Sequence, residues 1–424
     1  MFAFRGRAPV YIVVIALTAW PWTPTAFAQQ RVPLTIAEAE DLAIAAEPGL
    51  DALLARAAAL EERAVAAGQL PDPMLRVGLA NYPIESGGFS TEGMTQAQLG
   101  VRQSFPRARE HSAAEKRAMG EAFDHGADAR RREVLSAVRK AWLDVYLAEQ
   151  ASELVAESRP FFVDLVTITR SLYGVGRKSQ HDVLRAELEL SRLDDRLIEI
   201  GRTRSEAQAA LSRWLGEDAY RQLATTFPNW ESLPQLEELH AALAAHPLLA
   251  AAEAGVTASS AAVRVAEENK KPGWALDVGY GYREGFLPNG DPRSDMVSVS
   301  VTVDLPFFSE DRQDRKLAAA LGERRAATSS QAALQARLAS ELDAEYARWT
   351  DLTKRLALYD TQILAQSQGQ AQAALLAYQS DAGDFADVMR AWIDDLDTRL
   401  QRIQLQVKRA HSYAVLANLG GLEQ

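Results

Sequence analysis

Apolar and polar residues alternate along four short stretches of the chain, which predicts four β-strands. In the predicted strand 296–305 the apolar residues from 297 onward take the odd positions, Val297, Val299, Val301, Val303 and Leu305. The even positions are mostly serine, threonine and aspartate, so the strand has one apolar and one polar face. The stretches 74–82, 94–105 and 274–282 alternate similarly, 74–82 least regularly. Each has about the 9 to 12 residues that a tilted strand needs to cross a bilayer. The alternation equally fits a half-buried soluble sheet.

Apolar residues elsewhere recur at steps of three and four, which predicts very long helices. In the segment 309–378 the series runs through Leu338, Leu342, Trp349, Leu352, Leu356, Tyr359 and Ile363. Such a seven-residue repeat predicts left-handed coiled-coil packing. The segment 106–174 has a similar helix-forming composition, and a helix of this length spans about 100 Å. Pro160 predicts a kink in this first long helix, or its division into two segments.

Shorter helical segments accompany the long ones. The segments 34–69 and 236–271 are about half as long as the long helices. Each long helix is expected to end in a turn, here called a tip, and the return helix that follows each tip is also about half as long. Stacked end to end with the return helices, these segments would match the length of the long helices.

The order of these elements occurs twice, about 200 residues apart. Residues 29–230 and 231–424 each contain a helix, two strands, a long helix, a tip and a return helix, with the tips at 173–182 and 378–387. Two copies of one unit form one pseudo-symmetric body. We therefore predict a mainly α fold with a small β part, built from duplicated coiled-coil helices.

The N-terminus predicts export. Two arginines, an apolar stretch from Val10 to Trp20 and Ala26-Phe27-Ala28 identify residues 1–28 as a signal peptide. Its loss changes the formal net charge from −11 to −13, because two positive charges leave, and this acidic balance argues against a nucleic-acid partner. The chain has no cysteine, which excludes disulfides and a lipidated N-terminal cysteine. No later apolar run approaches about 18 residues, so membrane contact is expected through strands.

The ordered elements resemble the TolC-type outer-membrane efflux family. The likeness rests on the duplication, on the Leu70-Pro71-Asp72-Pro73 entry to the strands and on the first tip, from Tyr173 to Glu187. It covers essentially all of the mature chain. Four strands cannot close a barrel, since about eight is the practical minimum. The resemblance implies a homotrimer, in which the strands of three chains form a twelve-stranded outer-membrane β-barrel and the helices form a periplasmic α-barrel.

The function that the resemblance implies is the exit duct of a tripartite efflux pump. Its implied partners are a periplasmic adaptor protein, an inner-membrane RND transporter and outer-membrane lipid. The segment from Ser179 to Glu187 and the Pro-Asp-Pro entry are most similar to channels of heavy-metal efflux systems, so metal cations are the expected cargo. Such channels often carry a lipid-bearing N-terminal cysteine, which this chain lacks. Multidrug efflux, type I secretion and a secreted coiled-coil scaffold stay open as alternatives.

Candidate gate residues lie at the second tip. Asp381, Asp384 and Asp387 follow one another at intervals of three around Gly383, which predicts an acidic ring at the periplasmic mouth. Helix capping by these aspartates is the alternative. The resemblance places constricting acids at this tip, with Asp387 on a matching position. Arg390 stands at a second such position, where relatives carry an acid, so it either forms an Asp–Arg bridge between subunits or is a surface charge.

Candidate adaptor contacts lie at the first tip: Gly174, Gly176, Arg177, Lys178 and Ser179. Arg177 and Lys178 equally fit solvated turn residues. Gly174-Val175-Gly176 lacks the pattern of a phosphate loop and is better interpreted as a helix-to-helix turn. The six histidines have no metal-binding spacing, and no serine, histidine and aspartate set points to catalysis. We therefore expect no cofactor, no bound metal and no enzymatic activity.

Overall fold

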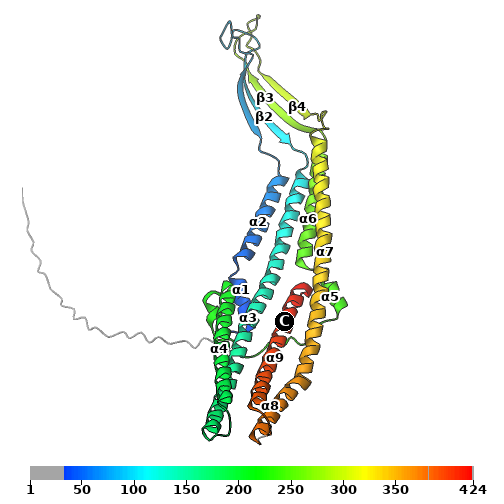
Figure 1. Cartoon of the computed structure of the whole chain (residues 1–424). Coiled ribbons are helices and arrows are strands. Elements are labelled where there is room, and N and C mark those ends of the chain that lie inside the picture. The colour runs from blue at the N-terminus through cyan, green and yellow to red at the C-terminus, as the bar shows by residue number, and fades with distance from the viewer. Residues whose placement is uncertain (1–32, 381, 423–424) are drawn as a thin grey trace, which may run out of the picture.

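The computed structural model describes residues 33–380 and 382–422. The predicted signal peptide, 1–28, lies outside the described residues. Long helices run side by side along one axis, and an antiparallel sheet extends from one end of them (Figure 1). The opposite end consists of two helix-to-helix turns, which are the two tips.

The elements follow the predicted duplicated order. Within the described residues the first repeat comprises α1 (Ile36–Ala45), α2 (Pro48–Gly68), β1 (Met74–Ala80), β2 (Gln96–Phe105), α3 (Arg109–Gly174) and α4 (Gln180–Leu215). A 3₁₀ turn, η1 (Gly216–Tyr220), follows. The second repeat comprises α5 (Leu236–Leu243), α6 (Pro247–Glu268), β3 (Gly273–Tyr282), β4 (Met296–Asp304), α7 (Gln313–Leu358), the π-turn η2 (Tyr359–Ile363), α8 (Leu364–Gln379) and α9 (Phe385–Gly420).

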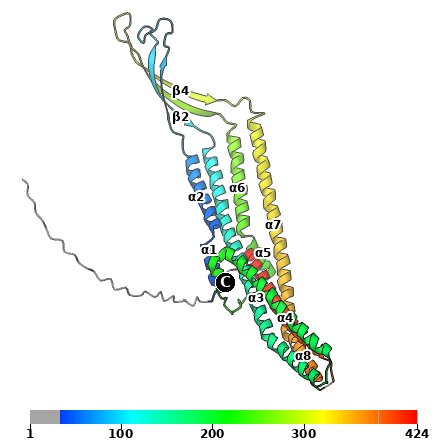
Figure 2. The same ribbon diagram turned by 60° about the vertical axis from the view of Figure 1, so that its left-hand side comes forward.

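The half-length helices stack end to end along the long ones, as predicted. Along α3, α2 covers the half nearer the sheet and α4 covers the half nearer the tip (Figures 1 and 2). In the second repeat α6 and α9 occupy the corresponding places beside α7 and α8. Predicted heptad positions of α7 are buried, among them Leu338 and Leu342 at 3% and 0% exposure. The seven-residue apolar repeat therefore identifies the packed face correctly.

The long helices are not divided at Pro160. Of the two outcomes predicted there, a kink or a division, the division is wrong, because α3 is continuous over 66 residues. Pro160 is exposed, so the backbone carbonyl that it leaves without an N–H partner is on the solvent side, where water can bind it. The second long helix is interrupted instead, by η2, a single turn of π-helix between α7 and α8. Arg402 of α9 pairs with Asp360 inside this turn, at 2.9 Å.

The sheet has the strand order β1-β2-β3-β4, with every neighbouring pair antiparallel. Its register aligns the predicted apolar positions in rows across the strands. One row contains Val77, Leu99, Tyr280 and Val297, and the next row on the other face contains Arg76, Gly100, Gly279 and Ser298. The sheet therefore has one apolar and one polar face.

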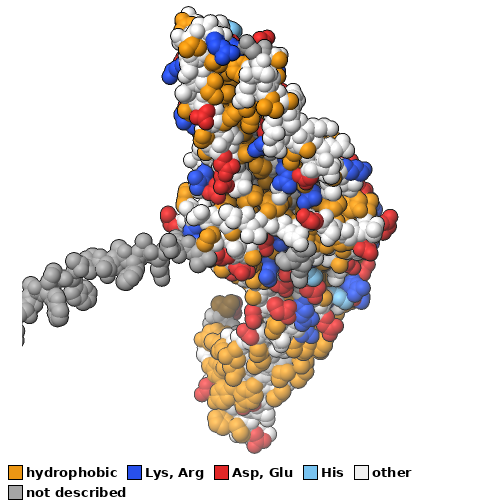
Figure 3. All heavy atoms as spheres, turned by 90° about the horizontal axis from the view of Figure 1, so that it is seen from below, with side chains coloured by type: hydrophobic (Ala, Val, Ile, Leu, Met, Phe, Trp, Pro, Cys, Tyr) orange, Lys and Arg blue, Asp and Glu red, His pale blue; other side chains and the backbone are white. Residues whose placement is uncertain are grey.

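The apolar face is uncovered in the single chain. Val77, Val297 and Val299 are 74%, 73% and 67% exposed. Figure 3 shows apolar side chains gathered at one end of the molecule with few charges among them, whereas charged groups are mixed over the rest of that view. A continuous exposed apolar surface of this kind is typical of contact with lipid or with another protein.

One segment, Leu236–Glu268, is long and apolar enough by length and composition to cross a membrane. The sequence pattern did not single it out, because its apolarity comes largely from alanine. In the structure it is divided into α5 and α6 at residues 244–246, and α6 packs between α3 and α7. We therefore assign it to the helical body.

Candidate functional site at the helix tips

The first tip is a tight turn closed by backbone hydrogen bonds. Gly176 has a φ of +72°, a conformation that favours glycine, and the amide of Arg177 donates to the carbonyl of Leu172 at 2.9 Å. Helix α4 then starts with a capping box, in which the Ser179 amide donates to Asp182 Oδ2 at 3.1 Å and the Asp182 amide donates to Ser179 Oγ at 3.3 Å. The turn is therefore locally well determined.

The second tip uses the equivalent residues differently. Asp384 is the N-cap of α9, but its side chain makes no capping hydrogen bond. The carboxylate of Asp387, at the position equivalent to Asp182, instead accepts from Arg390 Nη1 at 3.2 Å. Gly383 packs closely, because a Cβ there would lie 3.1 Å from Ala377 Cβ. Asp381 lies outside the described residues.

The two tips contact each other through Lys178 and Tyr378. Lys178 Nζ lies 4.6 Å from the centre of the Tyr378 ring, a cation–π distance. Tyr378 is 5% exposed and also meets the Phe385 ring, with the centroids 5.6 Å apart. Arg177 and Lys178 line a cavity of about 200 Å³ between the tips, whose other walls are mostly apolar side chains of α3 and α8. The candidate adaptor residues thus lie beside the second tip.

Sequence reasoning did not assign Tyr378 a role. The signal was present, since Tyr173 and Tyr378 recur at equivalent positions of the two repeats. Tyr173 is 48% exposed and Tyr378 is 5% exposed, so one tyrosine of the pair points outward and the other packs between the tips.

One ion pair further along the hairpins joins the two repeats, and a buried aspartate is held within the second repeat. Arg196 of α4 pairs with Asp397 of α9 at 2.6 Å. Asp395 is 3% exposed, yet its charge is compensated, because Ser367 Oγ donates to it at 2.8 Å and Arg399 lies 2.8 Å away. These contacts fix how the lower part of α9 packs against α4 and α8.

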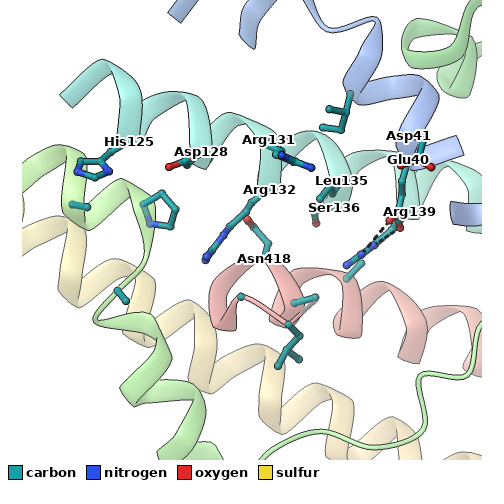
Figure 4. A pocket seen from close by; sticks show the side chains of 18 of the residues that line it. Glu40, Asp41, His125, Asp128, Arg131, Arg132, Leu135, Ser136, Arg139 and Asn418 are labelled. Carbon is teal, nitrogen blue, oxygen red and sulfur yellow. Dashed lines mark hydrogen bonds and ion pairs between the residues drawn. The ribbon is translucent and has the colours of Figure 1, made fainter. Parts of the chain in front are cut away.

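A larger cavity lies far from the tips, in the middle of the helical body. It has a volume of about 760 Å³ and is bounded by α1, α3, α6 and the end of α9. Figure 4 shows Arg132 reaching from α3 towards the end of α9, and Arg139 joined to Glu40. The Arg139–Glu40 pair is bidentate, with nitrogen–oxygen distances of 2.6 and 3.3 Å. Both arginines and carboxylates line this cavity, so its wall is neither uniformly positive nor uniformly negative.

His246, the N-cap of α6, lies beside this cavity, at the helical junction where α3, α6 and the end of α9 meet. It is 1% exposed, and its Nδ1 accepts from the Leu248 amide at 3.2 Å. Burial, and next the nearby Arg132 guanidinium, lower the pKa of His246 to about 4. Over residues 33–380 and 382–422, no cluster of histidine, aspartate and glutamate could hold a metal ion.

Comparison with known proteins shows which family this chain is similar to. Residues 239–422 match the family model for outer membrane efflux proteins. Protein CyaE of Bordetella pertussis is 27% identical over 99% of this chain and 89% of its own length. The second repeat therefore matches the outer membrane efflux protein family, as the resemblance predicted. The localisation predicted from the sequence, in the outer membrane with a large periplasmic helical part, agrees with this match.

Solved structures share the fold of this chain at low sequence identity. The outer-membrane channel OprN has a TM-score of 0.75 and 18% identity, with 91% of this chain and 90% of OprN covered. CusC has a TM-score of 0.75 and 16% identity, with 91% and 92% covered. The fold class predicted from the sequence is therefore confirmed.

Proposed function

We propose that this chain is the exit duct of a tripartite pump and works as a homotrimer. A periplasmic adaptor protein would dock at its tips, and an inner-membrane RND transporter would supply the cargo and the energy. In this role the chain performs no chemistry, and its task is to enclose a path through the periplasm and the outer membrane.

One observation carries the proposal: the sheet has an exposed apolar outer face and two unpaired edges. Within the described residues neither β1 nor β4 has a second strand partner. Strand edges exposed to lipid leave backbone groups without hydrogen bonds, at a cost of several kcal/mol each. Pairing β1 of one chain with β4 of the next removes these edges, and three chains give twelve strands, enough for a barrel. The long helices below each sheet would then surround a continuous tunnel.

We propose metal cations as the cargo on the basis of the second tip. Asp384 is exposed and the Asp387 side chain is 62% exposed, and threefold symmetry would repeat both around the mouth. Like charges around a narrow passage favour cations. Arg390 offsets part of this charge, so the preference is weaker than three free carboxylates per chain would give.

The exit-duct proposal is tested by extraction and by the mass of the purified protein. An alkaline wash of the membrane fraction should leave the protein in the pellet, and the detergent-solubilised protein should have the mass of three chains. Release by the wash as a single chain would instead support the secreted scaffold.

The cargo proposal is tested with a deletion strain and its complement. Growth is measured with copper, silver, zinc, cobalt, cadmium, nickel and several unrelated antibiotics. Sensitivity to one or two metals, restored by the intact gene, is the expected result. Broad antibiotic sensitivity would assign the duct to drug efflux, and loss of a protein from the medium would assign it to secretion.

A further inference from the structure

The polar face of the sheet carries more positive than negative charge. Arg76 and Arg102 on β1 and β2 share this face with Asp277 on β3. At the helical end of the sheet, Asp304 is paired with Arg107, which cancels both charges. Two arginines and one aspartate remain along the part of the sheet that would cross the bilayer.

The charges of this face are unequally compensated. Arg102 Nε lies 3.9 Å from Asp277 Oδ1, and Thr302 Oγ1 donates to Asp277 Oδ2 at 3.3 Å, so Asp277 is held by two neighbours. Arg76 is exposed, and no ion pair to it is found among the described residues. Within the described part of the chain, Arg76 is therefore a positive charge with no ionic partner.

Two glycines add no side chains to this face beside the arginines. Gly100 and Gly279 continue the row that begins with Arg76. Neither position has room for a larger side chain, because a Cβ on Gly279 would lie 2.8 Å from Ser298 Oγ and one on Gly100 would lie 3.3 Å from the carbonyl oxygen of Val278. The face is hollowed by about 310 Å³, and Arg76, Arg102 and Asp277 all line the hollow. The arginines thus face an open space that side chains of the same sheet do not fill.

We infer that Arg76 and Arg102 form a positively charged band inside the barrel, which makes the barrel section prefer anions over free cations. The inference rests on the proposed trimeric duct, in which the polar face lines the lumen and the net charge of the band is repeated three times. Rings of arginine are a general means of selecting anions in pores. The low-dielectric barrel wall strengthens the field of such a ring.

The band is opposite in sign to the acidic mouth, so the duct has two charge zones in series. A cation that is favoured at the tips meets a repulsive zone at the exit. A metal ion would pass this zone most readily as a neutral or anionic complex, and an anionic solute would pass it directly.

The experiment is the reversal potential of the purified channel in a planar bilayer with a KCl gradient. Asp277→Asn raises the net charge of the band to two per chain, Arg76→Gln lowers it to zero, and the double variant Arg76→Gln/Arg102→Gln makes it negative. The matched control is Arg102→Gln/Asp277→Asn, which removes the pair and leaves the net charge unchanged. We expect chloride permeability relative to potassium to follow the net charge, with at least about a twofold fall for Arg76→Gln at 0.1 M salt. The differences should largely vanish at about 1 M salt, where the Debye length is roughly 3 Å.

The outcomes separate the inference from the proposed function. Channels of normal conductance whose reversal potential is the same in all variants would overturn the charged band and leave the duct intact. The inference would also be overturned if the reversal potential of the control Arg102→Gln/Asp277→Asn shifted as much as that of Arg76→Gln. The shift would then not depend on the net charge of the band. A protein that forms no channels at all would overturn the trimeric duct itself.

Discussion

Asp387 and Arg390 form an ion pair within α9, with Arg390 Nη1 3.2 Å from Asp387 Oδ1. Both side chains are more than 60% exposed, so the pair lies at the surface of the tip. The sequence left open whether Arg390 bridges to a neighbouring subunit or is a surface charge. In the single chain it partners the aspartate one turn earlier in its own helix, and exposed pairs of this kind contribute at most about 1 kcal/mol. The pair is weak enough to exchange for a contact with another chain.

The gate is tested by removing either member of this pair. Asp387→Ala and Arg390→Ala should both raise single-channel conductance or antibiotic leakage if the pair narrows the mouth. They should change ion preference in opposite directions, because Arg390→Ala leaves the carboxylate uncompensated. Arg185→Ala is the matched control, since Arg185 holds the equivalent position after the first tip. Unchanged conductance in both tip variants would remove the gate assignment.

The contact between Lys178 and Tyr378 should couple the opening of the two tips. Lys178→Gln removes the charge, and Tyr378→Leu removes the ring while keeping an apolar side chain in the cavity. The cation–π contact is worth about 0.5–1 kcal/mol. Each variant should therefore speed amide hydrogen exchange in both tips about two- to fivefold, and the double variant should add little to Tyr378→Leu. Fully additive effects would show that the two side chains act independently.

Much of the fold could be predicted, because apolar residues that repeat with the period of a strand or a helix lie on one face of that element. The strands were placed to within about two residues, since the apolar positions of β4 repeat with the pleat. The stacking of half-length helices followed from their lengths. The packed face of the long helix followed from its heptads, and the burial of Leu338 and Leu342 confirms this face.

The remaining features depend on contacts that no local pattern records. The π-turn at residues 359–363 contains neither glycine nor proline, whereas Pro160, the expected breaker, is accommodated within α3. Packing against α2, α4 and α6 along the length of α3 outweighs the single hydrogen bond that Pro160 removes. The partners of Arg390 and Lys178 likewise could not be predicted, because long charged side chains have several acceptors within reach.

The two N-caps at the tips should differ in their contribution to stability. Ser179→Ala removes a capping box and should destabilise the start of α4 by about 1 kcal/mol. Asp384→Ala at the equivalent position of α9 should cost only a few tenths of a kcal/mol, since its side chain caps no amide. Hydrogen exchange of the first-turn amides measures both, with about a fivefold acceleration expected for Ser179→Ala. An equal effect of the two substitutions would contradict this difference.

His246 should make the helical junction sensitive to acid. The pKa of His246 is lowered to about 4 in the folded chain, against about 6.5 when unfolded, so the unfolded state binds more protons between these values. Stability is therefore complete above about pH 6.5 and falls as the pH drops towards 4, by up to about 3 kcal/mol.

His246→Asp tests the origin of this sensitivity. Glu47, the equivalent N-cap of α2, pairs with Arg130 at 3.1 Å, and an aspartate at position 246 would face Arg132 in a similar way. This variant should lose the acid sensitivity between pH 6.5 and 4, as followed by thermal unfolding. An unchanged pH profile in His246→Asp would show that another group is responsible.

The orientation of the sheet can be tested with two adjacent positions of β4. Val299 belongs to the apolar face and is 67% exposed, whereas Ser298 belongs to the polar face beside Gly279. In a barrel with its apolar face in lipid, Val299→Lys places a charge near the bilayer centre and should cost about 2–4 kcal/mol per chain. Ser298→Lys places the same charge in the water-filled lumen, where the cost is small. The amount of trimer recovered from the outer membrane should fall severely for Val299→Lys and little for Ser298→Lys. A reversed order would mean that the polar face meets the lipid, and equal recovery would mean that the sheet does not cross the membrane.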